Sequence, residues 1–269
     1  MQFLKLSDSL GVGNTKNDQY LPLDQFSSCI LVGVTGVGKT TLKARLLEKY
    51  NFYPLPGRRA LTDKIILPLV LPKDKIHKPV HDRCRRFAYT KAFRDLHPGG
   101  MGYVLSQIKI KMQSPSKPVL FDGLRGVDEV RYAACAMPSA FFIVLTVPDH
   151  LRIKRLLVRQ DSFDHAEDGT ALDPAWFEKI VSPGQCRELF DYVHKHGIPE
   201  TKLYKKTRIV IKEKDNYDQE ATRRFLMETV PDRTFAMDSS KHSPNEIIAA
   251  IDKHLQRTAM GHCKDNGKN

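Results

Sequence analysis

Short apolar runs alternate along this chain with longer segments whose apolar residues recur at helical spacing. Three uninterrupted runs predict buried strands at 29–32, 118–122 and 140–147. A helical pattern follows each run, around Leu42, Leu46 and Leu47, at 127–137 and at 150–160. Strands that alternate with helices are typical of an α/β fold with a parallel sheet. We therefore expect a three-layer α/β/α sandwich with a parallel sheet of about five strands.

Weaker patterns predict the remaining elements. We expect further helices at 81–97, 101–112, 172–193, 219–229 and 243–256. We expect strands at 208–212 and 235–238, a strand or connecting stretch at 65–67, and a basic connector at 195–206. Ser243, Pro244 and Glu246 form a capping pattern before the closing helix. On the 127–137 helix, Glu129 and Arg131 are expected to face outward.

One glycine-rich stretch carries the clearest chemistry. After the first strand comes the sequence Gly33-Val34-Thr35-Gly36-Val37-Gly38-Lys39-Thr40, which matches the phosphate-binding loop. Glycines let backbone N–H groups approach a phosphate, and the helix start adds the positive end of its dipole. We expect Lys39 to reach the β- and γ-phosphates and Thr40 to ligate Mg²⁺. The predicted nucleotide-binding residues are Gly33, Val34, Thr35, Gly36, Val37, Gly38, Lys39, Thr40, Thr41 and Arg155.

A carboxylate closes the second predicted strand. Asp122 follows the apolar run 118–121, where parallel-sheet proteins form their ligand crevice. An acid there suits a Mg²⁺-associated or catalytic role. Arg125 follows at the same edge and could bridge two phosphates bidentately. We predict Asp122 as a metal ligand with Thr40, and Asp122 and Arg125 as catalytic residues with Lys39.

The basic helix at 150–160 leads into an acidic, turn-rich stretch. Arg155 and Arg159 lie four residues apart on one face of that helix. The following segment, about 160–171, is expected to close over the nucleotide as a lid and exclude water. Arg159 is a further catalytic candidate.

We expect the acceptor site to involve residues between the first helix and the second strand. Arg58, Arg59, Thr62 and Asp63 come shortly after the first helix, where phosphoryl transferases commonly hold the acceptor. The 81–97 segment places arginines beside aromatic residues, which suits an acceptor phosphate or base, although a solvated helix face is the simpler interpretation. The candidates for acceptor binding are Arg59, Arg86, Arg94 and Arg125.

Composition narrows the class of protein. The chain has 269 residues, 41% of them hydrophobic, which is enough for a packed core. No apolar run approaches the roughly 20 residues that span a membrane, and no secretory signal opens the chain. The five cysteines are scattered without metal-ligand spacing, which favours reduced thiols and a cytoplasmic location. The net charge of +12 suits either a polyphosphate ligand or nucleic acid, of which we favour the former.

Three stretches together resemble a family. The loop at 33–40, Asp122-Gly123-Leu124-Arg125 and Arg155-Leu156-Leu157-Val158-Arg159 are similar in order and context to the P-loop kinases of the nucleoside monophosphate kinase-like group. That group includes adenylate kinase, guanylate kinase and dephospho-CoA kinase. The resemblance implies a P-loop NTPase fold, ATP and Mg²⁺ as cofactors, Arg125 on the acceptor phosphate and Arg155 beside the donor base.

The resemblance also implies a domain organisation. It covers about 28–170 and the C-terminal strand and helix, which gives an N-terminal extension at 1–27, a kinase domain at 28–258 and a polar tail at 259–269. The segment at about 172–230 is longer than the family pattern and could be an inserted subdomain. Acceptor-site signatures of the family are not recognisable between 54 and 100, so the acceptor and the oligomeric state stay open.

We therefore expect an ATP-dependent phosphotransferase that acts on a small acceptor, most simply a nucleotide or nucleotide-like phosphate. Two alternatives remain. A regulatory ATPase or GTPase switch would carry a partner-binding domain or a guanine motif, and no Asn-Lys-x-Asp sequence occurs. A kinase acting on nucleic-acid 5′ ends would explain the basic charge and would bind oligonucleotides in a salt-dependent way.

Overall fold

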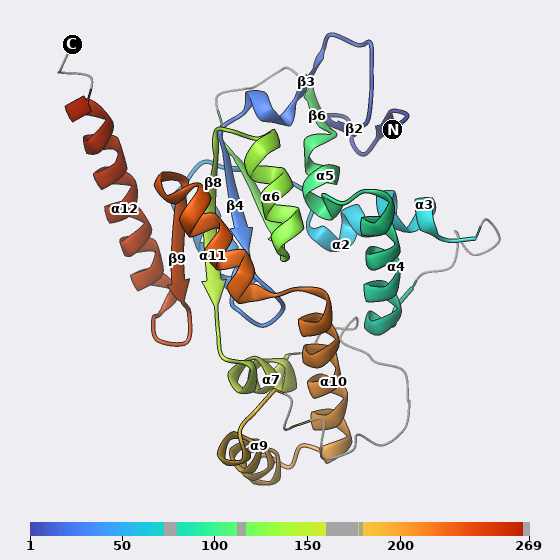
Figure 1. Cartoon of the computed structure of the whole chain (residues 1–269), viewed down its shortest axis with the longest axis vertical. Helices are drawn as coiled ribbons and strands as arrows, with labels where there is room; N and C mark the ends of the chain where they lie inside the picture. The colour runs from blue at the N-terminus through green and yellow to red at the C-terminus, as the bar shows by residue number, and fades with distance from the viewer. Residues whose placement is uncertain (73–79, 112–116, 160–176, 178–179, 266–269) are drawn as a thin grey trace.

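The computed structural model describes residues 1–72, 80–111, 117–159, 177 and 180–265, with the backbone alone described for 257–265 (Figure 1). Its centre is a five-stranded sheet in which every neighbouring pair is parallel. The strands, in spatial order, are β5 (Tyr53–Pro54), β7 (Val119–Leu124), β4 (Ser28–Val32), β8 (Ala140–Thr146) and β9 (Thr234–Asp238). The expected parallel sheet of about five strands is confirmed.

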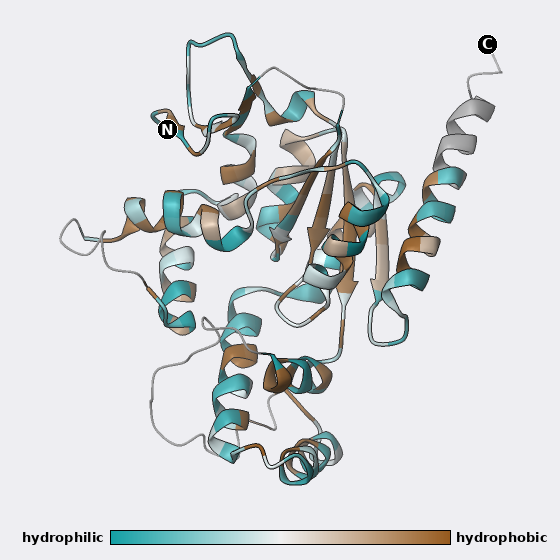
Figure 2. Ribbon diagram, turned by 180° about the vertical axis from the view of Figure 1, so that it is seen from behind, coloured by the Kyte–Doolittle hydropathy of each residue, from teal (hydrophilic) through white to brown (hydrophobic). Residues whose placement is uncertain are grey.

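Helices cover both faces of this sheet, and alternating residues of β4 show how. Ile30 and Val32 belong to one apolar cluster, which includes residues of α5 (Gly100–Ser106), α6 (Val127–Ala136) and α11 (Gln219–Thr229). Cys29 and Leu31 belong to a second cluster on the opposite face, with residues of α1 (Lys39–Lys49) and α12 (Pro244–Asp265). In Figure 2 the strands between these helices are largely brown, as expected when both faces are buried. The α/β/α sandwich is therefore confirmed.

The N-terminal segment is part of a second, antiparallel sheet. Its strands β1 (Leu4–Lys5), β2 (Leu10–Val12) and β3 (Tyr20–Pro22) join β6 (Ile108–Lys111) in the order β1-β2-β6-β3. The expected helix at 101–112 is therefore wrong in its second half, because α5 ends at Ser106. Buried and half-buried residues alternate along β6, which is the period of a strand with one face on the core. Within residues 1–27, the stretch 4–22 therefore contributes three strands that the sequence analysis did not predict.

A third apolar cluster lies beyond the C-terminal edge of the parallel sheet. It is formed by α7 (Asp149–Val158), α9 (Pro183–Lys195) and α10 (Glu200–Asn216), which stand together below the strand arrows in Figure 1. The predicted strand at 208–212 is wrong, and so is the connector at 195–206, because α10 runs through both. Ile209, Val210 and Ile211 are all buried, since α10 contacts α4 (Arg83–Leu96), α7 and α9. That burial on several sides overrides the strand preference of β-branched residues.

Other differences are local. The 65–67 stretch is helical, within a run formed by α2 (Arg58–Leu61), the π-helical η2 (Thr62–Ile66) and α3 (Leu67–Val70). Short 3₁₀ turns, η1 (Leu23–Gln25) and η4 (Pro231–Arg233), precede β4 and β9. The backbone of α12 continues to Asp265, so much of the expected polar tail is helical. The predicted cap is confirmed, because Ser243 and Glu246 exchange hydrogen bonds. The expected lid at 160–171 lies outside the described residues.

Two general expectations can be compared with the described part of the chain. No helix among the described residues has both the length and the apolar character needed to cross a bilayer. Cys29, Cys84, Cys135 and Cys186 are free thiols. The division of the chain at residues 27 and 258 stays a prediction.

Candidate active site

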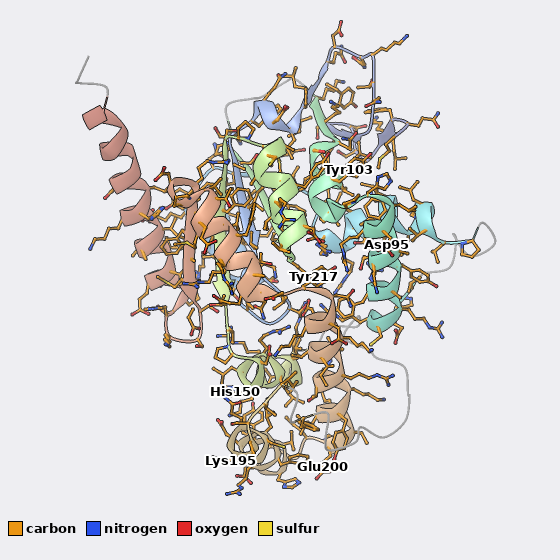
Figure 3. The ribbon with its side chains drawn as sticks, in the orientation of Figure 1. Asp95, Tyr103, His150, Lys195, Glu200 and Tyr217 are labelled. Atoms are coloured by element: carbon orange, nitrogen blue, oxygen red, sulfur yellow. The ribbon has the colours of Figure 1, made fainter. Side chains whose placement is uncertain are left out.

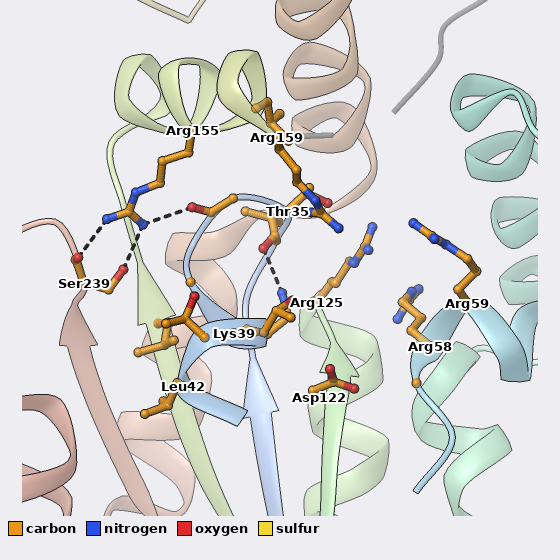
Figure 4. Close-up of a pocket in the computed structure, with 18 of the residues that line it drawn as sticks. Thr35, Lys39, Leu42, Arg58, Arg59, Asp122, Arg125, Arg155, Arg159 and Ser239 are labelled. Carbon is orange, nitrogen blue, oxygen red and sulfur yellow. Dashed lines mark hydrogen bonds between the residues drawn. The ribbon is translucent and has the colours of Figure 1, made fainter. Parts of the chain in front are cut away.

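A pocket of about 790 Å³ opens at the C-terminal ends of β4 and β7. Its walls come from the glycine loop, α2, α4, the end of β7, α7 and the connection between β9 and α12. Figure 4 shows side chains from these elements converging on one space. The carboxyl edge of a parallel sheet is where α/β proteins bind ligands. Segments that lie far apart in the sequence therefore line a single cavity at the predicted edge of the sheet.

The glycine loop joins β4 to α1 and forms the floor of the pocket. Gly33 has a φ of +142°, and a Cβ built there would lie 2.6 Å from the carbonyl oxygen of Leu145. Gly38 has a φ of +96° at the N-cap of the 11-residue α1. Only glycine accommodates such a turn without strain. Strand, loop and helix therefore have the geometry that a phosphate-binding loop requires.

Lys39 lies in the first turn of α1 and points back over the loop. Its ammonium donates to the carbonyl of Val34 at 2.8 Å and to that of Gly33. Burial and, to a smaller extent, the neighbouring Arg125 lower the pKa of Lys39 to about 7, although Glu213 and Asp122 act in the opposite direction. A buried cation surrounded by other cations is stabilised by an added anion. Lys39 is thus suited to a phosphate.

Asp122 lies within β7, two residues before the strand ends at Leu124. Its Oδ1 atom is buried and accepts no hydrogen bond from the described residues, while Lys43 Nζ lies 3.4 Å away as an ion pair. Thr40 lines the same pocket from the first turn of α1. One carboxylate and one hydroxyl fit Mg²⁺, which keeps several of its waters in such sites. Among the described residues no cluster of three His, Cys, Asp or Glu side chains offers a fuller set of protein ligands.

Arg125 projects into the pocket from the turn between β7 and α6. Its guanidinium donates to Glu213 at 2.7 Å, and its backbone N–H donates to Glu129 at 2.9 Å. Burial lowers the pKa of Arg125 to about 10; Glu213 opposes this shift, and Arg58 and Arg83 add to it. Arg125 therefore lies in the pocket, as predicted, and the groups around it carry more positive than negative charge.

Glu213 on α10 is a central residue that the sequence analysis missed. Its side chain is fully buried and accepts from the backbone N–H and the hydroxyl of Thr35, at 3.0 and 2.9 Å. It also accepts from Arg125 and from Arg152, the latter at 2.6 Å. Burial alone would raise its pKa, but Arg125, Arg152 and Arg83 outweigh burial and lower it to about 2. Glu213 directly follows the strand predicted at 208–212. The Ile-Val-Ile run of that prediction gives no reason to single out the glutamate after it.

Arg152 and Arg155 tie α7 to the loop. Arg152 is fully buried; it donates to the Thr35 carbonyl at 2.8 Å and to Asp149 at 2.6 Å. Arg155 donates to the carbonyl of Gly36 at 3.0 Å and to Ser239 at 2.9 and 3.2 Å. Figure 4 shows Arg155 extending from α7 to the loop and to Ser239. Both arginines brace the loop, and Arg155 also lines the pocket as expected.

A second buried acid, Glu129, holds the opposite wall. Its side chain is 1% exposed, so the expected outward orientation is wrong. Arg58 donates to both oxygens of Glu129 at 2.7 Å, and also to the Tyr217 hydroxyl at 2.8 Å. Burial would lower the pKa of Arg58, but Glu129 reverses this and raises it. The N-terminal turn of α6 faces the core here, because Arg58 neutralises the acid.

The predicted acceptor residues separate into two groups. Arg59 and Arg86 line the pocket from α2 and α4, Arg125 lines it from the turn after β7, and Arg86 pairs with Asp63. Arg94 is not among the lining residues; it donates to the Tyr217 hydroxyl at 2.9 Å and to Asn216 at 3.0 Å. Figure 3 labels Tyr217 at the upper end of α10, close to α6. Arg94 therefore supports the wall instead of contacting the cavity.

Cations dominate the lining. Lys39 and seven arginines surround the pocket, and Asp122 is the one carboxylate among the described lining residues. The arginines are Arg58, Arg59, Arg83, Arg86, Arg125, Arg155 and Arg159. Arg58 and Arg83 are not among the predicted acceptor residues, because sequence spacing cannot tell which side of a helix meets a cavity. Such a lining suits one or more strongly anionic ligands.

Comparison with known proteins adds little beyond the fold. No protein-family model and no curated protein matches this chain in sequence. Among solved structures, a gluconokinase from Sinorhizobium meliloti 1021 is similar, with 14% identity, a TM-score of 0.43, and coverage of 89% of this chain and 97% of that one. A deoxyadenosine kinase from M. mycoides with bound dATP is similar, with 12% identity, a TM-score of 0.36, and coverage of 85% and 99%. Likenesses this loose carry no argument about activity.

Proposed function

We propose that this protein is an ATP-dependent phosphotransferase that moves a γ-phosphoryl group to a small acceptor, a nucleotide or a nucleotide-like phosphate. The observation that supports this most is the shared cavity. Its lining brings the phosphate loop and Lys39 together with three arginines from other segments, Arg59, Arg86 and Arg125. Two anionic substrates can therefore meet in one pocket, which a transfer reaction requires.

The donor side consists of residues that bind and orient phosphates. The loop N–H groups and the start of α1 hold the phosphates, and Lys39 neutralises charge on the transferring group. Arg155 and Arg159, at the far rim of the pocket, are the candidates for contacts with the base or the phosphates. Thr40 and Asp122 would hold Mg²⁺, which when bound offsets charge on the bridging phosphate oxygens.

The acceptor side supplies positive charge and needs no general base. An acceptor phosphate is already nucleophilic, so Arg59, Arg86 and Arg125 have only to bring it in line with the donor. If the acceptor were a hydroxyl, Asp122 would be the candidate base, because its buried Oδ1 accepts no hydrogen bond from the described residues. The arginines favour the phosphate.

The test is a screen of ATP consumption against nucleoside monophosphates, nucleosides, dephospho-CoA and 5′-hydroxyl oligonucleotides. We expect ADP formation that depends on one class of phosphorylated acceptor. Lys39→Ala should abolish it, whereas Lys49→Ala should not, since Lys49 lies at the other end of α1 and pairs with Asp252. Full ADP release by the Lys39→Ala variant, or no acceptor-dependent ADP release by the wild type, overturns the proposal.

A further inference from the structure

Two side chains at the C-terminal end of α10 connect it to the pocket: Tyr217 lines the pocket, and Glu213 contacts the lining residues Thr35 and Arg125. Glu213 and Tyr217 lie four residues apart, so one helical turn separates them and both face the same side. Glu213 is fully buried, and Tyr217 is 3% exposed and lines the pocket. The other end of the same helix begins with Glu200, whose side chain contacts Tyr204 and His194, far from the pocket lining. One end of α10 therefore belongs to the site and the other does not.

Glu213 connects the apex of the phosphate loop to the walls. Two of its contacts are with Thr35, and Arg83 donates to the same Thr35 hydroxyl. Arg152 donates both to Glu213 and to the Thr35 carbonyl. The backbone of Thr35 is thus held at its N–H by α10 and at its carbonyl by α7. A loop held at both backbone groups of one residue, and so at two successive peptide units, has little freedom to tilt.

Glu213 also determines where Arg125 points. The Arg125 guanidinium donates to Glu213 Oε1 at 2.7 Å, and its centre lies 5.9 Å from the ring centroid of Tyr217. Its Nε atom is buried and has no hydrogen-bond partner among the described residues. An arginine held at one nitrogen, with another donor buried and unpaired, is oriented by its partner and retains capacity for a ligand.

We propose that Glu213 is a positioning residue, which fixes the loop apex and Arg125 in one relative arrangement so that donor and acceptor phosphates align. The inference rests on the proposed phosphotransferase function. Glu213 lies behind the loop and touches no reacting group. It acts through Thr35 and Arg125, and Tyr217 limits the space into which Arg125 could turn.

The Glu213→Gln variant separates the contact of Glu213 with the Thr35 N–H from its contact with Arg125. An amide oxygen still accepts from the Thr35 N–H, but an NH₂ group cannot accept from an arginine. We expect kcat to fall about 100-fold while the ATP Kd changes less than about threefold, since one aligned electrostatic contact is lost. Glu200→Gln removes the same charge from the same helix and should leave kcat unchanged. If Glu213→Gln does not fold, Glu213→Asp keeps the charge, shortens the reach and should lower kcat about tenfold.

A double-mutant cycle tests whether Glu213 acts through Arg125. On an Arg125→Ala background, Glu213→Gln should lower kcat less than about threefold further, because the group that it positions is gone. Losses that multiply as for independent sites would overturn the inference. So would a Glu213→Gln protein with the kcat of the wild type.

A measurement without turnover separates this inference from the proposed function. In the unliganded protein, Glu213→Ala should speed hydrogen exchange of the Thr35 amide at least about tenfold, whereas Glu200→Ala should not. Exchange of β4 and β8 amides reports that the fold is intact. Unchanged protection of Thr35 in the Glu213→Ala protein overturns the inference, whatever the wild type does with ATP. A wild type that transfers no phosphoryl group overturns the proposed function, and the exchange result still decides the role of Glu213.

Discussion

The phosphate loop and the arginine wall of the same pocket are built in opposite ways. The loop is a continuous stretch from Gly33 to Thr40, and its shape depends on backbone torsions and glycines. The wall consists of side chains from α2, α4, α7, α10 and the turn before α6. Buried acids hold it together: Glu129 for Arg58, and Glu213 for Arg125 and Arg152. The comparison teaches that local sequence can specify a phosphate site, whereas buried ion pairs assemble the site opposite it.

The largest expected effect comes from removing an acid from the wall. Glu129→Ala leaves Arg58 buried without its bidentate partner, and we expect the free energy of unfolding to fall by about 3–5 kcal/mol. Denaturant unfolding measures this. Asp128→Ala on the same helix breaks an exposed pair with Arg131 and should cost less than about 1 kcal/mol. Equal losses in the two variants would contradict the distinction between buried and surface pairs.

Adding a single methyl group at Gly33 should destabilise the phosphate loop. Gly33→Ala combines a positive φ with a Cβ only 2.6 Å from a carbonyl oxygen, and we expect a loss of about 2–4 kcal/mol together with weaker ATP binding. Thermal unfolding and calorimetric titration measure the two losses. At Gly184, in the first turn of α9, an added Cβ meets nothing within 4 Å. Gly184→Ala should therefore be neutral or stabilising, and a loss there comparable to that at Gly33 would refute the steric explanation.

Lowering the pH should reduce the free energy of unfolding, because Glu213 becomes protonated. Its pKa is lowered from an ordinary 4.5 to about 2, so the stability that it contributes is fully present above about 4.5 and is lost as the pH falls towards 2. For one such group the linked change is roughly 3 kcal/mol. Glu213→Gln cannot ionise, so its unfolding free energy, although lower at neutral pH, should decline less between pH 4.5 and 2. Parallel declines in the two proteins would show that Glu213 does not carry this dependence.

The smallest expected effect is on the KM for the acceptor. It should distinguish the arginines that line the cavity from Arg94, which lies behind it. Arg59→Ala and Arg86→Ala should each raise the KM for the acceptor about 10- to 100-fold, since a charge-assisted contact is lost. Arg94→Ala should change that KM less than about threefold, because Arg94 contacts Tyr217 and Asn216. Initial rates at saturating ATP measure the values. A larger effect at Arg94 than at Arg59 would reverse the assignment.

Sequence alone predicted the parallel sheet and the loop because both have local signatures. Apolar runs marked β4, β7 and β8, and the spacing from Gly33 to Thr40 marked the turn between strand and helix. The mistakes came where long-range packing decides the outcome. Within α10, the stretch 208–212 is predicted as a strand because Ile209, Val210 and Ile211 favour strands, whereas packing against other helices buries these residues in a helix.

The same limit explains the residues that were missed. Glu213 lies 178 residues from Thr35, so no spacing rule joins them. Glu129 was placed outward because a charged residue usually faces solvent, and its partner Arg58 lies 71 residues away. Arg94 was chosen with Arg86 on charge alone, although only Arg86 lines the pocket. Sequence patterns predicted Lys39 and several of the arginines that line the site, while the buried acids that orient them required the fold.

The central claim is that one pocket transfers a phosphoryl group between two anionic ligands. Following ³¹P resonances of ATP and a phosphorylated acceptor in one reaction tests it most directly. The proposal predicts that the γ-phosphate signal of ATP disappears as ADP and a newly phosphorylated acceptor appear in equal amounts, with no such change in the Lys39→Ala protein. Release of inorganic phosphate without any phosphorylated acceptor would contradict it.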